Sequence, residues 1–197
     1  MYQKYQTDAV VLRSRESGEA DKLYALYTRD FGLVYARASA VRRESSKMRY
    51  GLQNFSLVNI SLIRGKRSWR IGGARALENL AVAENIVGAQ AFGRIADLVT
   101  KLVAGEEKNE YLYETLVEAR RALMDSKFNL SPAIPTIEII CVARVLYTLG
   151  YISAEALQTT LFSHTDFAAE SLREAEMRRE KLLSSINHAL SETQLVR

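Results

Sequence analysis

Residues 7–40 read TDAVVLRSRESGEADKLYALYTRDFGLVYARASA, and this stretch decides the fold expected for the amino-terminal part of the chain. Three runs rich in β-branched, aromatic and other apolar residues are separated by the turn sequences SGEAD and DFG. In the third run the small residues Val34, Ala36 and Ala38 alternate with other residues and therefore share one face of a strand. Small side chains on the core-facing side favour a tightly curved sheet, as in a small closed barrel.

The residues that follow extend this pattern. Residues 41–51 are polar and rich in Arg and Ser, which predicts a long connection with a short helix. Apolar and polar residues alternate again over 55–64, and residues 67–72 predict a fifth strand after the turn at 65–66. Five short strands within about 70 residues, with one long connection after the third, are typical of an OB-fold barrel.

After Gly72 and Gly73 the apolar residues recur at the spacing of helices rather than of strands. The expected helical elements are residues 92–102, 111–124 and 132–149, with a last amphipathic segment over 166–190. The run 137–149 is apolar on most sides, which indicates a central buried helix. We therefore predict an α+β fold class, with a five-stranded OB-fold domain over residues 1–76 and an all-α helical bundle over residues 77–197.

Charge divides the chain in nearly the same place. The first 80 residues contain 15 Lys and Arg against 7 Asp and Glu, a net charge of +8, whereas the remaining 117 residues carry a net charge of −4. The overall charge of +4 hides this contrast. Because a concentrated positive surface suits a polyanion, the amino-terminal domain is predicted to bind nucleic acid.

The cations gather in two segments of the predicted barrel domain and on its strands. Arg can contact phosphate oxygens through two hydrogen bonds and can stack over bases. The predicted DNA-binding residues are Arg13, Arg37, Arg42, Arg43, Lys47, Arg49, Arg64, Lys66, Arg67 and Arg70, with Arg15 on the same strand as Arg13. The predicted base-stacking residues are Tyr35, Tyr50 and Trp69, although any one aromatic residue is more often part of a core.

Two other interpretations remain open at this point. Phosphate and stacking contacts do not distinguish deoxyribose from ribose, so an RNA-binding OB-fold module fits the same residues. A basic face can also meet an acidic protein partner, which would make the chain a non-enzymatic interaction scaffold. In the helical half, the apolar residues between 137 and 162 favour either ordinary core packing or a groove that holds a partner segment.

The sequence lacks the usual patterns of a catalytic or metal site, and we expect no enzyme activity, no cofactor and no bound metal. The GKR sequence at 65–67 lacks the first Gly and the Ser or Thr of a phosphate-binding P-loop. The single Cys141 is expected to be a buried thiol, and with only two His residues a zinc site is not expected. Without an export signal or an apolar stretch long enough for a membrane span, a cytoplasmic, nucleoid-associated protein is expected.

Several segments, in this order, resemble a known family. They are TDAVVLRSR at 7–15, GEADKL at 18–23, TRDFGL at 28–33 and LQNFSLV at 52–58. The sequence is similar here to the amino-terminal domain of RecO, a family of bacterial recombination mediators in DNA repair. The resemblance implies an OB-fold followed by helices, binding of single- and double-stranded DNA, and annealing of complementary strands. It also implies assistance to RecA loading, together with RecR and the single-strand DNA-binding protein.

Two further expectations come from this resemblance. In the family the helical domain holds the acidic, hydrophobic carboxy-terminal tail of the single-strand DNA-binding protein, and Arg120, Arg121 and Arg144 are predicted to meet that tail. Many members also carry a four-cysteine zinc element after a Leu-Gly-Tyr stretch, which corresponds to residues 149–151 here. Because residues 153–167 contain no Cys, zinc is not expected in this chain.

Overall fold

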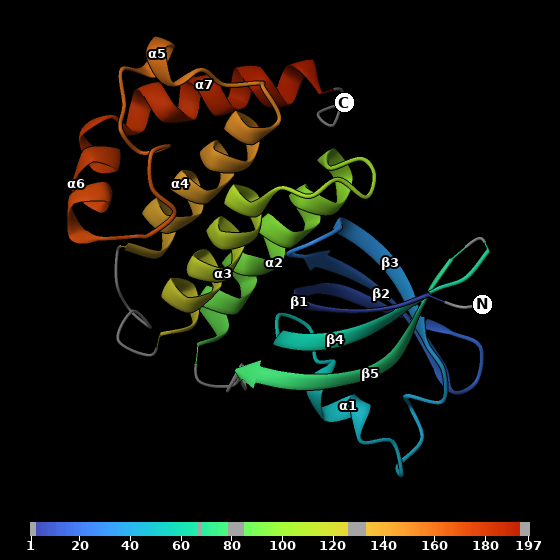
Figure 1. The fold of residues 1–197 in the computed structure, drawn as a ribbon. Helices are drawn as coiled ribbons and strands as arrows, with labels where there is room; N and C mark the ends of the chain where they lie inside the picture. The colour runs from blue at the N-terminus through green and yellow to red at the C-terminus, as the bar shows by residue number, and fades with distance from the viewer. Residues whose placement is uncertain (1–2, 67, 79–84, 126–132, 194–197) are drawn as a thin grey trace. The chain divides into compact units, whose positions relative to one another are not determined.

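The computed structural model describes residues 3–66, 68–78, 85–125 and 133–193 (Figure 1). The chain divides into two compact units. The first unit comprises Met1–Ala81 and Val103–Tyr113, and the second comprises Val82–Leu102 and Glu114–Arg197. Arg67, one of the predicted DNA-binding residues, lies outside the described residues.

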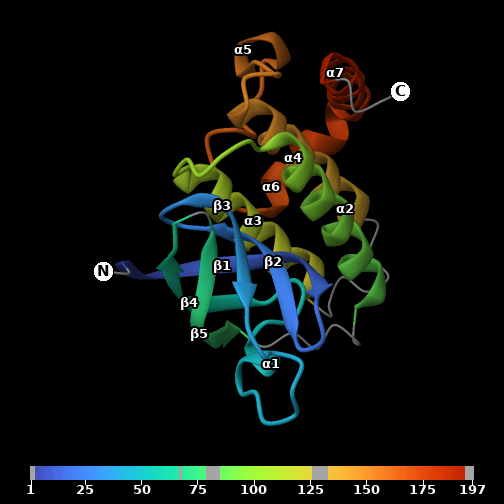
Figure 2. The same cartoon turned by 90° about the vertical axis from the view of Figure 1, so that its right-hand side faces the viewer.

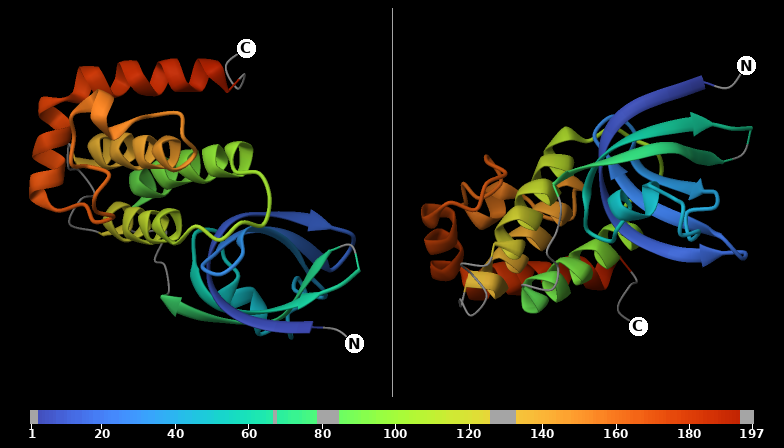
Figure 3. Two further views of the ribbon diagram at one scale, coloured as in Figure 1. Left: turned by 45° about the horizontal axis from the view of Figure 1, so that its top comes forward. Right: turned by 90° about the horizontal axis from the view of Figure 1, so that it is seen from below.

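The first unit is built on a five-stranded sheet that closes into a barrel. Its strands are β1 Gln3–Ser17, β2 Asp21–Thr28, β3 Gly32–Ala38, β4 Leu57–Arg64 and β5 Trp69–Glu78. Their order around the barrel is β1-β2-β3-β5-β4, and β4 pairs back with β1. The neighbouring strands are antiparallel except for β3 and β5, which are parallel. The left panel of Figure 3 shows the strands curving around a common axis, and the predicted OB-fold is confirmed.

The barrel core contains the small residues of β3 that the sequence pattern placed on one face. Val34, Ala36 and Ala38 are all 0% exposed and belong to one apolar cluster with residues of the other four strands. Ala36 lies directly opposite Trp69 in the β3–β5 pair, so the small side chain leaves room for the indole ring. The predicted direction of the β3 side chains is therefore confirmed.

Three aromatic side chains pack together at the edge of this core. The ring centroids of Tyr5 and Phe31 lie 5.1 Å apart, those of Tyr5 and Trp69 5.6 Å, and those of Phe31 and Trp69 5.4 Å. The two contacts of Tyr5 are edge-to-face, an arrangement that aromatic quadrupoles favour. Tyr5 and Phe31 are half-buried, so this cluster joins the core to the surface.

The long connection between β3 and β4 contains a short helix, α1 Met48–Gly51, as the sequence predicts. Figures 1 and 2 both show α1 below the strands of the barrel, where Gly51 packs against the backbone of Ala74 and Ala76 in β5. Val41, Met48 and Leu52 pack against the barrel core, so the polar segment is held to the barrel by its few apolar residues.

The segment Val103–Tyr113 belongs to the barrel unit although it follows a helix of the second unit. Arg29 places its guanidinium 4.7 Å from the ring centroid of Tyr113 and forms an ion pair of 3.6 Å with Glu110. At the start of β3, Gly32 lies so close to the backbone of Glu107 that an added Cβ would be 2.1 Å from the Glu107 carbonyl oxygen. The barrel is therefore completed by residues far along the chain.

The second unit is helical. The helices of the described residues are α2 Ile86–Leu102, α3 Glu110–Met124, α4 Ala133–Thr148, α5 Ala154–Leu157, α6 Ala169–Met177 and α7 Arg179–Glu192, of which α3 begins in the first unit. Most residues of α4 are buried, and its apolar side chains form a cluster with those of α5, α6 and α7. The predicted central buried helix is confirmed. Pro132, the first residue of the predicted helix, lies outside the described residues.

The amphipathic segment expected over 166–190 is two helices, because the chain bends at Arg178 between α6 and α7. The Arg178 guanidinium donates a hydrogen bond of 3.1 Å to the Leu157 carbonyl and pairs with Glu174. The bend lets buried Ala175 of α6 and Leu182 of α7 join the same cluster around α4. A single periodic pattern does not reveal such a bend.

Within the described residues, no helix combines the length and apolar character needed to cross a lipid bilayer. Among the same residues, no group of three or more His, Cys, Asp and Glu side chains is placed to hold a metal ion. Burial raises the pKa of the Cys141 thiol to about 12, so this side chain remains protonated at neutral pH.

Candidate nucleic-acid interface

A row of cations crosses four strands of the barrel. Arg15 of β1 pairs with Leu23 of β2, and Leu23 pairs with Arg37 of β3. Arg37 in turn lies opposite Arg70 of β5 in the parallel pair. Residues that are directly opposite each other in a sheet project from the same face. We call Arg15, Arg37 and Arg70 the cationic row.

The cationic row lies on the outer face of the barrel. Ala36 and Ala38, the neighbours of Arg37 along β3, point into the core, so Arg37 points outward. All three row residues are exposed. Because adjacent strands are about 4.8 Å apart, the row spans about 14 Å from Arg15 to Arg70. It is long enough to contact several phosphate groups.

A second, parallel set of outward-facing residues accompanies the row. Arg13 of β1 pairs with Ala25 of β2, and Ala25 pairs with Tyr35 of β3. The Tyr35 side chain is 48% exposed, and Arg13 is exposed as well. An aromatic ring therefore lies on the same outer face as the cations, as base stacking would require.

Asp21 connects the cationic row to the turn between β1 and β2. One Asp21 carboxylate oxygen accepts a hydrogen bond of 2.7 Å from the backbone N–H of Ala40, and the other accepts one of 2.8 Å from Arg37 Nε. The hydrogen bond from Ala40, together with the Arg37 charge, holds the pKa of this carboxyl below its usual value. Asp21 therefore fixes the orientation of Arg37 and partly neutralises it.

The lowered pKa predicts how stability depends on pH. A carboxyl with a depressed pKa in the folded state stabilises the fold above its unfolded-state pKa, and loses that contribution as the pH falls through the folded-state pKa. We expect Asp21→Asn to lower the melting temperature slightly at neutral pH, and the difference from the wild type to shrink on acidification. Thermal unfolding across a pH series tests this, with Glu19→Gln on the same turn as the control. A difference in melting temperature that stays constant down to acidic pH would show that the Asp21 charge contributes nothing to stability.

Arg42 has a structural role at the same turn. Its guanidinium donates a hydrogen bond of 3.1 Å to the Glu19 carbonyl and forms an ion pair of 3.0 Å with Glu16. Its backbone N–H donates to the Ala20 carbonyl at 2.9 Å. Arg42 thus fastens the β3–β4 connection onto the β1–β2 turn, and its charge is already shared with an acidic neighbour.

Other predicted cations keep their side chains available to solvent. Across the part of the chain that the structure describes, the side chains of Arg43, Lys47 and Lys66, like those of Arg15 and Arg70, have no hydrogen bond or ion pair. All five are exposed. They are the residues with the most freedom to meet an external anion.

Arg49 and Tyr50 form a separate pair on α1. Arg49 donates a hydrogen bond of 2.7 Å to the Tyr50 hydroxyl and lies 4.7 Å from the centroid of its ring. The helix approaches β5 near Ala74 and Ala76, where Gly51 packs closely. Ala74 is four residues beyond Arg70, about 13 Å along the strand. The structure therefore does not bring this pair to the cationic row.

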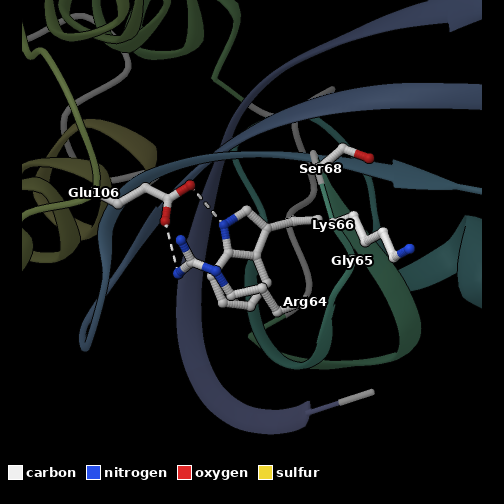
Figure 4. Close-up of a pocket in the computed structure, with 6 residues that line it drawn as sticks. Arg64, Gly65, Lys66, Ser68 and Glu106 are labelled. Atoms are coloured by element: carbon white, nitrogen blue, oxygen red, sulfur yellow. Dashed lines mark hydrogen bonds and ion pairs between the residues drawn. The ribbon is translucent and has the colours of Figure 1, made fainter. Parts of the chain in front are cut away.

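Arg64 faces the core edge rather than the outer row. It pairs in register with Trp69, and its guanidinium lies 4.9 Å from the centroid of the indole ring. Glu106 accepts a hydrogen bond of 2.7 Å from Trp69 Nε1 and forms an ion pair of 3.1 Å with Arg64 (Figure 4). The charge pattern of the sequence does not reveal Glu106, because it lies 37 residues from Trp69.

The prediction that Trp69 stacks on bases is corrected by its burial. Its side chain is only 3% exposed and forms part of the barrel core. Tyr5, Phe31 and Arg64 all pack against its indole ring. Tyr35 and Tyr50, by contrast, are exposed, and only Tyr35 shares a face with the cationic row.

Two of the three cations predicted to meet a partner tail are also buried. Arg144 is 0% exposed and donates hydrogen bonds to the carbonyls of Leu161 (2.8 Å) and Thr165 (2.7 Å). It holds the loop after α5 against α4, since a buried guanidinium must be hydrogen-bonded. Arg120 is 2% exposed, so it presents no surface charge. Arg121 is exposed and pairs with Glu118 at 2.7 Å.

The fold and the cationic row define an OB-fold protein with a positive outer face. In OB-folds, oligonucleotides bind the face of strands 2 and 3 and the loops that follow strands 1 and 4. Here that face carries Tyr35 and Arg37. Arg42 is hydrogen-bonded to the loop between β1 and β2, and Lys66 lies in the loop between β4 and β5.

Comparison with known proteins finds relatives of the amino-terminal part of the chain. Residues 1–79 match the family described as "Recombination protein O N terminal". The chain is 32% identical over 120 residues to a DNA repair protein RecO of Pelotomaculum thermopropionicum, covering 60% of this chain and 47% of that protein. A RecO protein of Heliobacterium modesticaldum is 35% identical over 99 residues, covering 50% of this chain and 36% of that protein. The amino-terminal part of the chain is therefore similar to the amino-terminal domain of RecO proteins.

One RecO protein of Desulfitobacterium hafniense is 44% identical over 62 residues, which is 32% of this chain and 23% of that protein. The matched region therefore spans less than half the length of each of these relatives.

Proposed function

We propose that this chain binds the backbones of single- and double-stranded DNA through the cationic row and the two adjoining loops. As a recombination mediator in DNA repair, it brings complementary strands together by neutralising their charge, without any covalent step. The observation that carries this proposal is the placement of Arg15, Arg37 and Arg70 in one row on the outer face of the barrel, which also carries Tyr35. Phosphate contacts of this kind position a strand without reading its sequence.

The proposal extends to the partners of the family. We propose that the chain acts with RecR and the single-strand DNA-binding protein to assist RecA loading. Among the cations predicted to meet the tail of the latter protein, Arg121 alone remains exposed, so it is the first residue to test for that contact. The domain boundary between residues 76 and 77 likewise stays a prediction.

Salt dependence tests the electrostatic basis of the proposal. If about five phosphates of a single strand are engaged, log affinity should fall with log salt concentration at a slope near −3.5. The measurement is fluorescence anisotropy of a labelled oligothymidine with the full chain, between about 50 and 200 mM salt. An affinity that does not change with salt would contradict backbone binding.

The competing interpretations give different results in the same assay. Competition with an RNA oligomer of matched sequence distinguishes an RNA-binding module, because that module would be displaced more readily by RNA. A protein-interaction scaffold would bind neither oligomer. Annealing is tested by mixing the chain with two labelled complementary strands, with and without single-strand DNA-binding protein.

A further inference from the structure

The turn between β4 and β5 forms a small pocket beside the barrel core. The pocket has a volume of about 140 Å³ and is lined by Arg64, Gly65, Lys66, Ser68, Trp69 and Glu106 (Figure 4). The turn itself is closed by a hydrogen bond of 3.0 Å from the Gly65 N–H to the Ser68 carbonyl. The lining thus contains two cations, a hydroxyl and one carboxylate, a composition that favours binding of an anion.

Glu106 already supplies a negative charge beside the Arg64 guanidinium. Its two carboxylate oxygens are used separately, one by Trp69 Nε1 at 2.7 Å and the other by Arg64 Nη1 at 3.1 Å. A phosphate group also presents several oxygens to a guanidinium and can replace a carboxylate in this arrangement. The Lys66 ammonium group points away from Glu106, so the second cation of the pocket is not neutralised (Figure 4).

The contact between Glu106 and Arg64 is weak enough to be exchanged. The side chains are 37% and 54% exposed, and ion pairs in such positions contribute little because water screens them. No other acidic side chain is paired with Arg64 in the described ranges. A phosphate that reaches Arg64 can therefore compete with Glu106 for the guanidinium.

We propose that Glu106 is an intramolecular counterion of this pocket, which a nucleic-acid phosphate displaces from Arg64 when the strand binds. The inference rests on the proposed function and adds a way in which Glu106 regulates the binding of DNA. Glu106 lowers the affinity for any single phosphate, so a strand must also engage the cationic row in order to open the pocket. Short or isolated anions are thereby disfavoured relative to a continuous backbone.

The matched variants Glu106→Gln and Glu110→Gln test this proposal. Both remove one negative charge from the same segment, but only Glu106 lies in the pocket. With the full chain and a labelled oligothymidine, we expect Glu106→Gln to bind about two- to fivefold tighter than Glu110→Gln, the effect of removing one exposed ion pair. In an Arg64→Ala background this advantage should vanish, because the displaced contact no longer exists.

Trp69 supplies an independent readout, since it is the single tryptophan of the chain. Because the same Glu106 carboxylate contacts Arg64 and Trp69 Nε1, its displacement should change the Trp69 fluorescence when the oligonucleotide binds the wild type, and this change should be smaller in Glu106→Gln. Equal affinities of the two Gln variants, or an advantage that persists with Arg64→Ala, would overturn the inference while leaving DNA binding intact. A wild-type chain that binds no oligonucleotide would overturn the proposed function as well.

Discussion

Replacing Arg15, Arg37 and Arg70 together by Ala is expected to weaken binding of a single-stranded oligonucleotide about a hundredfold at about 0.1 M salt. Each phosphate contact on a single strand contributes about 0.7 log units of affinity at that salt concentration, through release of condensed counterions. Three lost contacts therefore remove about two log units. The slope of log affinity against log salt should become shallower by about 2. Fluorescence anisotropy at several salt concentrations measures both quantities.

The control must lose the same charge elsewhere. Lys101, Arg173 and Lys181 are exposed cations of the helical unit, and their replacement by Ala also lowers the net charge by three. If binding depends only on overall charge, the two triple variants will be equally weak, and the cationic row is not the binding surface. Unrelated oligonucleotide sequences should lose affinity about equally in the row variant, since backbone contacts carry no sequence information.

The second large effect is expected for Gly32→Ala, which should lower the free energy of unfolding by about 2–4 kcal/mol. The added Cβ would lie 2.1 Å from the carbonyl oxygen and 2.9 Å from the carbonyl carbon of Glu107. Both are backbone atoms, so no flexible side chain can move aside. Gly32 also has φ of +62°, a conformation that an L-residue adopts only with strain.

Gly18→Ala separates these two causes. Gly18 has a similar φ of +76°, but an added Cβ would meet no atom within 4 Å. Its replacement should cost only the backbone strain, about 1 kcal/mol. Urea denaturation of both variants, compared through their midpoints, measures the difference. Equal losses would mean that the chain around Glu107 does not approach β3 as closely as the structure indicates.

Much of the barrel could be predicted from local patterns. The alternation at Val34, Ala36 and Ala38 correctly gave the inner face of β3, and therefore the outward direction of Tyr35 and Arg37. Side-chain direction in a strand depends only on the parity of the position, so a few consecutive residues are enough to reveal it. The central buried helix was predictable from a different local pattern, because the run 137–149 is apolar on most sides.

The environment of single residues was less predictable. Trp69 and Arg144 were expected at binding surfaces, yet both are buried and hold parts of the chain together. A Trp or Arg residue has both an apolar part and hydrogen-bond donors, so its type alone does not distinguish a core position from an exposed one. What decides is the set of neighbours, and those neighbours come from distant segments.

By itself, the sequence determined which side chains of each strand point inward, where the turns lie, and that the positive charge concentrates in the amino-terminal part. Only the tertiary structure decided which of these charges meet. Arg15, Arg37 and Arg70 come into one row through the pairing of four strands, and Glu106 reaches Trp69 from beyond the barrel strands. The physical reason is that side-chain direction is a local property of the backbone, whereas strand register and the path of a returning segment depend on packing of the whole unit.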